Sequence, residues 1–245
     1  MSTIPKPRSE TVRPEITRLP ELTFWRRGFR NFVRIVLRFF TWMCLNINIS
    51  GLENMPDEGP LVIVSNHLGD ADVFVGIAYT KASVDIMSKA ELYDLPLLGK
   101  LMHAYGVIWV HRGQPDRRAL RAALDGLKDG RILALAPEGR ESMTGELEEG
   151  TGGAAYLAQK SKAPILPVTF TGTENKFVFS SLKRFKRAHI TLTIGPVFHL
   201  NEYPDRKTEI EQGTLKIMRT LARQLPSTYR GVYRQDISAG SESEK

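Results

Sequence analysis

Cysteine is almost missing from this sequence. Cys44 is the only one among 245 residues. An internal disulfide needs two cysteines and a cysteine-based metal cluster needs several, so both are excluded. One free cysteine is compatible with a reducing compartment.

Two further signatures are absent from the sequence. Residues 1–20 are polar and have no apolar h-region, so we expect no secretory signal there. No serine stands in a G-x-S-x-G pattern, so hydrolysis by a serine nucleophile has no support.

The positive charge is concentrated at one end of the chain. The formal net charge is +7, and residues 1–50 contain nine Lys or Arg but only three acids. A basic excess confined to one end predicts an anionic partner, either a membrane surface or a nucleic acid. No nucleic-acid motif occurs, so we expect no nucleic-acid role.

Residues 24–45 predict an amphipathic helix about 33 Å long. Arginines recur every four residues on one face, and aromatic and aliphatic residues fill the opposite face. Crossing a bilayer would bury three arginines at about 2.5–3.5 kcal/mol each, so we expect the helix to lie in the interface, with its basic face on anionic headgroups. The predicted membrane contacts are Trp25, Arg30, Arg34, Arg38, Phe39 and Trp42.

Two alternatives remain open at this point. The helix 24–45 could instead pack on its own domain with a solvated basic face. The patch Lys183, Arg184, Lys186 and Arg187 is either a second membrane contact or a solvated turn.

The remaining chain predicts an α/β fold with a mainly parallel central sheet flanked by helices. We predict a disordered segment at 1–20, the amphipathic helix within 21–50, one domain over 51–230 and a disordered tail at 231–245. The expected strands are 61–65, 84–88, 106–110, 131–136, 164–172 and 189–195, and the expected helices are 73–82, 95–105, 115–128, 153–159 and 206–224.

Three polar clusters follow expected strands, and the carboxyl ends of parallel strands share one edge of a sheet. The clusters begin at Asn66, His111 and Pro137. At this edge, His67 could act as a general base, and a carboxylate five residues later could orient its ring. The start of the next helix would keep the imidazole neutral. Alternatively, Asp70 or Asp72 caps the helix and His67 is a turn residue.

The other two clusters carry groups that could hold a substrate. Arg112, followed by a glycine, suits a phosphate or carboxylate, or it forms a salt bridge to Asp116. Glu138 could accept hydrogen bonds from substrate hydroxyls, or it caps a turn. Arg140 could bind a second anionic oxygen, or it pairs with Glu141 or Glu146.

Taken together, the clusters resemble the glycerolipid acyltransferase family that includes 1-acylglycerol-3-phosphate acyltransferase. NHLGDAD (66–72) is similar to its N-H-x4-D block, and GVIWVHRG (106–113) to the second block. PEGRES (137–142) is similar to the third block, and PILPVTFTGT (164–173) to a fourth with Pro167. The order and spacing agree over about residues 50–200.

The resemblance implies transfer of a fatty acyl group to a lysophospholipid hydroxyl, most simply 1-acylglycerol-3-phosphate giving phosphatidate. The donor would be acyl-CoA or acyl carrier protein, with no metal, no cofactor and no acyl-enzyme. His67 would be the base, Asp72 its partner and Asp70 a helix cap. Arg112, Glu138, Gly139 and Arg140 would bind the acceptor, and the enzyme would sit on the cytoplasmic face of the membrane as a peripheral or monotopic protein.

The third block departs from the family pattern. The family usually has threonine and then arginine after the glycine, whereas this chain has Arg140 and then Glu141. A lysine that many relatives carry further on is also replaced, in the stretch EEGTGGAAY (148–156). The alternatives are therefore a less anionic acceptor, such as an amino-acid or glycosyl lipid, or a non-catalytic lipid-binding protein at the membrane surface.

Overall fold

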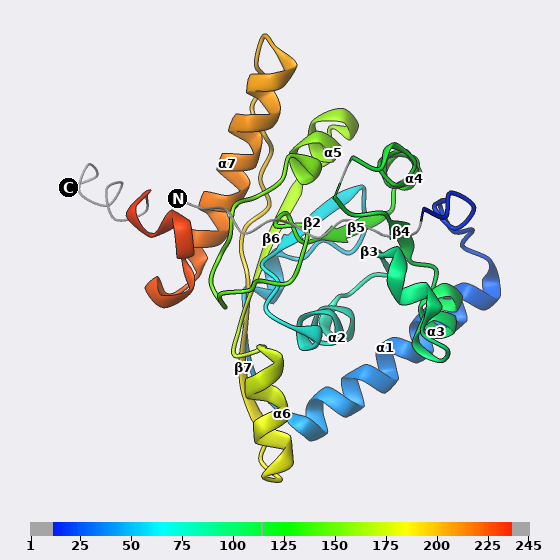
Figure 1. The fold of residues 1–245 in the computed structure, drawn as a ribbon, viewed down its shortest axis with the longest axis vertical. Helices are drawn as coiled ribbons and strands as arrows, with labels where there is room; N and C mark the ends of the chain where they lie inside the picture. Colours follow the sequence, from blue (N-terminus) through cyan, green and yellow to red (C-terminus); the bar gives the residue numbers. More distant parts are fainter. Residues whose placement is uncertain (1–11, 114, 237–245) are drawn as a thin grey trace.

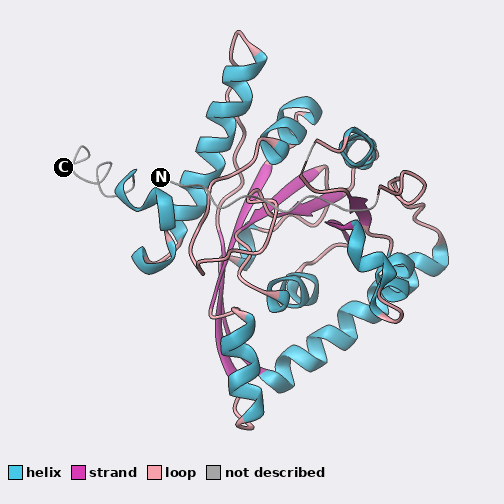
Figure 2. Cartoon of the chain, in the orientation of Figure 1, coloured by secondary structure: helices cyan, strands magenta, loops and turns pink. Residues whose placement is uncertain are grey.

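The computed structural model describes residues 12–113 and 115–236 of the chain. One seven-stranded sheet runs through the molecule in the order β1-β7-β6-β2-β5-β3-β4, with helices on both faces (Figures 1 and 2). The strands are β1 (Leu45–Ser50), β2 (Leu61–Ser65), β3 (Val84–Lys89), β4 (Ile108–Val110), β5 (Ile132–Leu135), β6 (Ile165–Thr171) and β7 (Ala188–Ile194). The predicted α/β fold is confirmed.

The two faces of the sheet carry different helices. The α-helices are α1 (Phe24–Cys44), α2 (Asp70–Tyr79), α3 (Leu98–Tyr105), α4 (Arg117–Lys128), α5 (Gly153–Ser161), α6 (Asn175–Lys183) and α7 (Arg206–Gln224). Helices α4, α5 and α7 cover one face, and α1, α2, α3 and α6 lie on the other side (Figure 1). The sequence predicted neither β1 nor α6.

The core explains why the central strands read as unbroken apolar runs. In β2, Val62 and Val64 pack with α4, α5 and α7, whereas Leu61 and Ile63 pack toward α2. Successive side chains of a strand point to opposite faces, so a strand covered on both sides needs apolar residues at every position. Each such side chain contributes about 1.5–3 kcal/mol on burial.

Strands β1 and β7 run opposite to the other five strands. β6 pairs antiparallel with β7, and β1 pairs in parallel with β7. Ser65, the last residue of β2, pairs with Val168 of β6. Val168 in turn pairs with Ile194, the last residue of β7. β7 begins six residues further out, at Ala188 opposite Leu45. The paired starts of β1 and β7 therefore project roughly 20 Å beyond the carboxyl end of β2.

Helix α1 lies against α2 and α3, and its basic row faces the domain (Figure 1). Nη1 of Arg34 donates to the carbonyl oxygen of Lys81 at 2.6 Å, and the guanidinium of Arg38 lies over the ring of Tyr79. The aromatic face points outward, and the side chain of Trp25 is 82% exposed. The other exposed apolar residues of this face are Phe24, Phe32, Ile35, Phe39, Phe40, Trp42 and Met43.

The most buried member of the row is Arg30, which forms an ion pair with Asp85 of β3. Their side chains are 2% and 1% exposed, and Nη2 lies 2.7 Å from Oδ1. Arg30 also donates to the carbonyl oxygens of Tyr105 and Gly106. Nη1 of Arg131 lies 3.6 Å from Oδ2 of Asp85, an ion-pair distance rather than a hydrogen bond.

The predicted orientation of this helix is therefore wrong. Arg30 is buried under the domain and cannot meet lipid headgroups, and Arg34 and Arg38 also contact the domain. The alternative that the helix packs on its own domain is confirmed, but its solvated basic face is wrong for Arg30, which is buried. In the part of the chain that the structure covers, no helix combines the length and the apolarity that crossing a bilayer requires.

The predicted boundaries also need correction. The described part of the first segment, 12–20, packs on the domain, because Ile16, Thr17 and Pro20 are buried. The domain begins before residue 51, since β1 is part of the sheet. At the other end, Tyr233 is buried, so the predicted tail does not begin at 231. The disorder predicted for 1–11 and 237–245 lies outside the described residues.

The buried pair yields a stability prediction. We expect Arg30→Ala to lower the free energy of unfolding by about 3–5 kcal/mol, because it leaves the Asp85 carboxylate buried with little compensation. Arg34→Ala removes a more exposed guanidinium and should cost less than about 1 kcal/mol. Urea unfolding of both variants measures the difference, and equal losses would contradict the assigned burial of Arg30.

Candidate active site

A short turn joins β2 to α2 and holds a histidine-aspartate pair. Nδ1 of His67 donates to Oδ2 of Asp72 at 3.0 Å. The same oxygen accepts the backbone N–H groups of Leu68, at 2.6 Å, and Gly69, at 3.0 Å. One carboxylate oxygen therefore closes the turn and also fixes the ring orientation. The predicted proximity of His67 and Asp72 is confirmed.

The pair leaves the other ring nitrogen available. With Nδ1 protonated toward Asp72, Nε2 of a neutral His67 carries the lone pair. No hydrogen bond to Nε2 is found within 12–113 and 115–236, and the side chain is 22% exposed. Such a nitrogen can take a proton from a molecule that reaches it.

The pKa of His67 lies above its ordinary value. Burial alone would lower this pKa, but the hydrogen bond and charge of Asp72 outweigh it. The charge of Glu141 also raises the pKa, and that of Arg112 lowers it. The sequence predicted that the start of the helix keeps the imidazole neutral, whereas the net effect of the surrounding groups raises its pKa, because the Asp72 carboxylate is adjacent.

The two aspartates of the turn have different positions. Asp70 is the exposed first residue of α2, and Gly69 occupies the N-cap. Asp72, in the first turn of the helix, accepts the Gly69 N–H, so the capping contact predicted for Asp70 is made by Asp72 instead. The Asp70 backbone N–H donates to Oδ1 of Asn175, at the start of α6.

Glu138, which follows β5, lies directly behind His67. Its Oε1 accepts the His67 backbone N–H at 3.3 Å, and its Oε2 accepts that of Glu148 at 2.8 Å. Burial raises the pKa of Glu138 to about 7, although both N–H groups favour the ionised form. The next residue, Gly139, is exposed and has a φ of +75°, a left-handed conformation that favours glycine. Glu138 therefore braces the turn that carries His67.

Arg140 does not pair with Glu141 or Glu146. Its side chain is buried, and Nε and Nη2 donate to Oε2 of Glu148 at 3.0 and 2.6 Å. These donors are directed at Glu148, so the anion-binding role predicted for Arg140 has no geometric support. Glu141 instead lies near His67, and Nδ2 of Asn175 donates to its Oε1.

Arg112 belongs to the same edge of the sheet. Its charge opposes protonation of His67, and burial lowers the pKa of Arg112 while the charge of Glu91 raises it. The predicted alternative partner, Asp116, instead contacts His111 and caps α4. Lys89, at the end of β3, is close enough to lower the pKa of Glu141.

Sequence reasoning did not assign two asparagines that shape this edge. Asn66 is buried and forms two hydrogen bonds with the backbone of Phe170, which ties β2 to β6. Asn175 connects α6 to Asp70 and Glu141. Asn66 stood beside His67 in the first motif, whereas no pattern in the sequence pointed to Asn175.

A second histidine-aspartate pair has the same spacing. Nδ1 of His111 lies 2.9 Å from Oδ2 of Asp116, but its Nε2 accepts the backbone N–H of Arg13 at 2.7 Å. His111 is buried, so this pair holds the amino-terminal segment on the domain. Only the pair at His67 leaves its outer nitrogen accessible.

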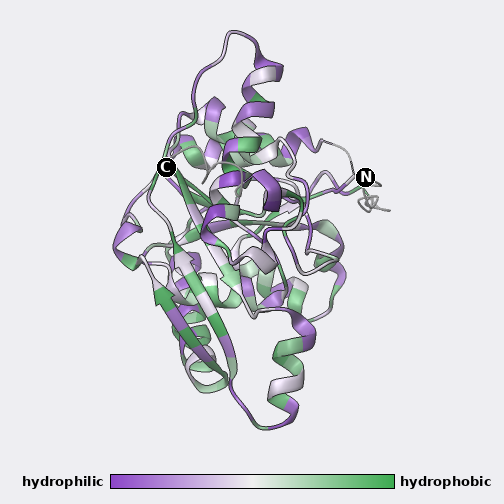
Figure 3. Ribbon diagram, turned by 90° about the vertical axis from the view of Figure 1, so that its left-hand side faces the viewer, coloured by the Kyte–Doolittle hydropathy of each residue, from purple (hydrophilic) through white to green (hydrophobic). Residues whose placement is uncertain are grey.

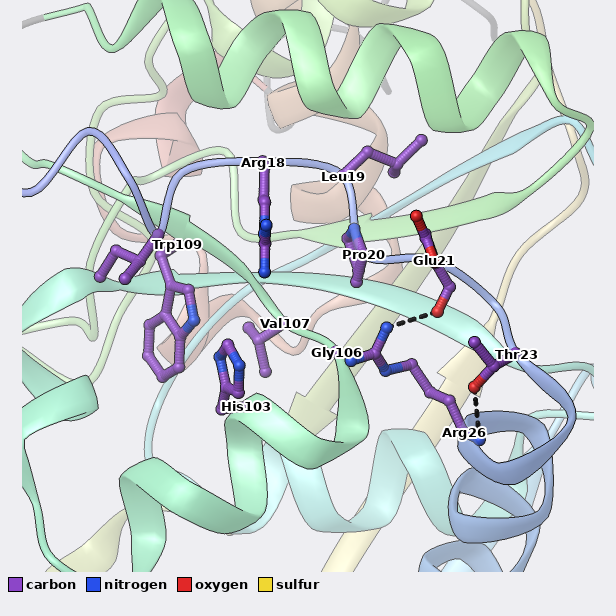
Figure 4. Close-up of a pocket in the computed structure, with 11 residues that line it drawn as sticks. Arg18, Leu19, Pro20, Glu21, Thr23, Arg26, His103, Gly106, Val107 and Trp109 are labelled. Atoms are coloured by element: carbon purple, nitrogen blue, oxygen red, sulfur yellow. Dashed lines mark hydrogen bonds between the residues drawn. The ribbon is translucent and has the colours of Figure 1, made fainter.

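A cavity of about 300 Å³ lies between residues 16–26 and the segment that leads into β4 (Figure 4). Arg26 crosses it to the carbonyl oxygen of Glu21, and Trp109 and His103 line another side. Gly106 and Val107 precede β4, so the cavity is at the amino end of a strand parallel to β2. His67 follows the carboxyl end of β2, so the cavity is at the opposite edge.

Comparison with known proteins gives matches of sequence and of fold. Residues 46–171 match the family model described as Acyltransferase. A relative from Arabidopsis thaliana, 1-acyl-sn-glycerol-3-phosphate acyltransferase LPAT1, chloroplastic, is 31% identical over 61% of this chain and 43% of its own length. A relative from Bacillus subtilis, 1-acyl-sn-glycerol-3-phosphate acyltransferase, is 27% identical over 64% of this chain and 76% of its own length. The chain thus matches less than half of the plant protein.

A solved structure shares the fold. It is the crystal structure of the 1-acyl-sn-glycerophosphate (LPA) acyltransferase, PlsC, from Thermotoga maritima. The TM-score is 0.62 at 21% identity, and the match covers 83% of this chain and 84% of that chain. The similarity supports the sheet topology described above.

The geometry of the turn predicts how His67 titrates. In Asp72→Asn the charge of the partner is lost, so burial dominates and the pKa of His67 should fall from above its ordinary value to below it. Asp70→Asn changes a more distant group and should leave this pKa nearly unchanged. NMR titration of the imidazole measures both. A larger shift in Asp70→Asn would overturn the assignment of Asp72.

Proposed function

The chain belongs to the acyltransferase family, and from this premise we propose that it transfers a fatty acyl group from an acyl thioester to the free hydroxyl of a lysophospholipid. The acceptor we favour is 1-acylglycerol-3-phosphate, with phosphatidate as product, because the named relatives from plants and bacteria carry this activity in their names. The donor is acyl-CoA or acyl carrier protein, and the reaction needs no metal or other cofactor.

One observation carries this proposal. His67 is oriented through Nδ1 by Asp72 and keeps Nε2 accessible at the carboxyl edge of the sheet. A general base must reach the proton that it removes, and its pKa should be near the working pH. His67 meets the first condition through its exposure, and the adjacent Asp72 carboxylate raises its pKa above the ordinary value of an imidazole, which favours uptake of a proton.

The transfer combines attack of the acceptor hydroxyl on the thioester with departure of the thiol. Nε2 of His67 takes the proton of the acceptor hydroxyl as its oxygen attacks the thioester carbonyl carbon. Asp72 stabilises the imidazolium that forms. The carbon–sulfur bond breaks, the thiolate leaves, and the imidazolium returns the proton to sulfur. The products are the new ester and a free thiol, and no acyl-enzyme forms.

Arg112 is the group that we assign to the phosphate of the acceptor. It lies near His67, and a guanidinium can bind two phosphate oxygens at once. Gly139 would allow close approach of the acceptor at the neighbouring turn, while Glu138 acts by holding the His67 backbone.

The membrane seat that we propose uses the outward face of α1. Its exposed aromatic side chains suit the interfacial zone of a bilayer, where indole and phenyl rings are favoured. The protein would bind the cytoplasmic face of the membrane peripherally or as a monotopic protein. Lipid acceptor and lipid product both require such a seat.

One observation favours a second class of acceptor. Glu148 balances the charge of Arg140, and the Glu141 carboxylate lies near His67, so fewer positive groups face the site than the family pattern predicts. A less anionic acceptor, such as an amino-acid or glycosyl lipid with one free hydroxyl, fits this charge distribution. A screen of acceptors with one acyl thioester and mass-spectrometric detection of the acylated product decides between the two classes.

The matched histidines supply the test of mechanism. We expect His67→Ala to lower turnover by about 10²–10⁴-fold, because general-base catalysis typically contributes that much. His111→Ala removes a histidine with the same aspartate spacing and should retain the chemical step while lowering thermal stability. Release of free thiol measures turnover in both variants.

If His67→Ala turned over as fast as the unmodified protein, His67 would not be the general base. Circular dichroism of both variants serves as the control for folding. If no acceptor is acylated by the unmodified protein, the non-catalytic lipid-binding alternative gains support instead.

Membrane binding through α1 is tested by comparing substitutions on its two faces. Serine at Trp25, Phe39 and Trp42 together should lower partition onto lipid vesicles by at least about a hundredfold, since each ring loses apolar burial. Glutamine at Arg34 and Arg38 should lower it less than about tenfold, because these guanidinium groups contact the domain. Vesicle co-sedimentation measures both, and a larger effect of the glutamine pair would refute the outward orientation.

A further inference from the structure

Helix α6 ends in a basic loop that the proposed chemistry does not use. The α6 tip comprises residues 183–187, which read Lys-Arg-Phe-Lys-Arg and are all exposed. Residues 175–201 contain five Lys or Arg and no Asp or Glu. The tip therefore presents charge of a single sign.

An aromatic side chain stands among these charges. Phe185 is 100% exposed and has a φ of +55°, which is uncommon for a residue other than glycine. Phe177 and Phe179 of α6 are also exposed, while Val178 faces the core. Figure 3 shows α6 leading into a largely hydrophilic loop at the lower end of the molecule. An exposed ring flanked by lysine and arginine is typical of an interfacial membrane contact.

The α6 tip is joined to the end of α1. Nη2 of Arg187 donates to the carbonyl oxygens of Trp42 and Leu45, and its Nε donates to that of Leu45. β7 follows the tip directly, and its first residue pairs with Leu45, the first residue of β1. The tip and the aromatic end of α1 therefore lie side by side beyond the edge of the sheet (Figure 1).

We propose that the α6 tip is a second membrane contact, which inserts Phe185 into the interface of a bilayer while Lys183, Arg184 and Lys186 meet anionic headgroups. The inference rests on the membrane seat proposed for α1, and it adds a lipid class: α1 binds through its aromatic face, and the tip selects for negative charge. The contact at the tip completes a surface that also includes Trp42.

An acidic protein, such as an acyl carrier protein, would also attract the three charges. The apolar groups favour the membrane, because a bilayer interface accommodates Phe185 and the neighbouring outward face of α1 on one surface. Three basic residues near an anionic bilayer are together sufficient to favour anionic over neutral vesicles by about a hundredfold.

Charge reversal tests whether the basic residues of the α6 tip bind anionic lipids. Lys183, Arg184 and Lys186 are replaced together by Glu, and binding is measured by flotation with phosphatidylcholine vesicles that contain or lack phosphatidylglycerol. We expect partition onto the anionic vesicles to weaken by at least about a hundredfold, with little change on the neutral ones. The matched control reverses Arg117, Arg118 and Arg121, which are exposed on α4 at the opposite face of the sheet, and should retain most of the binding.

Insertion of the ring is tested separately. In a Cys44→Ser background, Phe185→Cys carries an environment-sensitive fluorophore, and Arg117→Cys carries it in the control. We expect a blue shift of emission from position 185 on anionic vesicles and none from position 117. Both readouts work without turnover, so the absence of acyltransferase activity would not affect them.

The contrary outcomes are distinct. If both reversal variants lost vesicle binding equally, the loss would depend only on the net charge of the protein, and the proposal would be overturned. An unshifted probe at position 185 on vesicles that bind the protein would also overturn it. If reversal at the tip leaves vesicle binding intact but weakens binding of acyl carrier protein, the tip is a protein-docking site instead.

Discussion

The turn after β2 depends on one oxygen atom, Oδ2 of Asp72. It accepts N–H donors from His67, Leu68 and Gly69, all within 3.0 Å. Hydrogen bonds to a charged group contribute about 1.5–3 kcal/mol each, so this carboxylate is a major local source of order. Glu138 supports the same turn from behind through the His67 backbone. His67 is therefore held by backbone and side chain together, which limits the positions that its Nε2 can take.

The fold could be predicted from the sequence where apolar periodicity was unambiguous. The buried strand at Leu61–Ser65 and the long helix at Arg206–Gln224 begin and end where their patterns predict. β1 was missed because alternating Asn and Ile after a helix does not reveal its pairing with β7. The predicted orientation of α1 was wrong because an amphipathic pattern defines two faces but does not say which of them packs on the domain. The buried ion pair with Asp85 of β3 turns the basic face inward.

The candidate site was predictable in its local parts. Asp72 lies five residues from His67, so spacing alone could identify their contact. The partners of Arg140 and Glu141 depend on how the loop after β5 folds back and on where α6 begins. Glu148 and Asn175 became visible as partners only in three dimensions. Burial, rather than spacing, separates His67 from His111, since both have an aspartate at the same distance along the chain.

The projecting starts of β1 and β7 form a two-stranded arm that extends beyond the rest of the sheet. β6 supports β7 from Thr191 to Ile194, whereas the outer part of β7 pairs with β1 on one side only. Helix α6 ends beside the start of this two-stranded arm and begins at Asn175, whose side chain accepts the backbone N–H of Asp70. The turn at His67 is thus linked to the outer end of this arm by a single helix about 13 Å long.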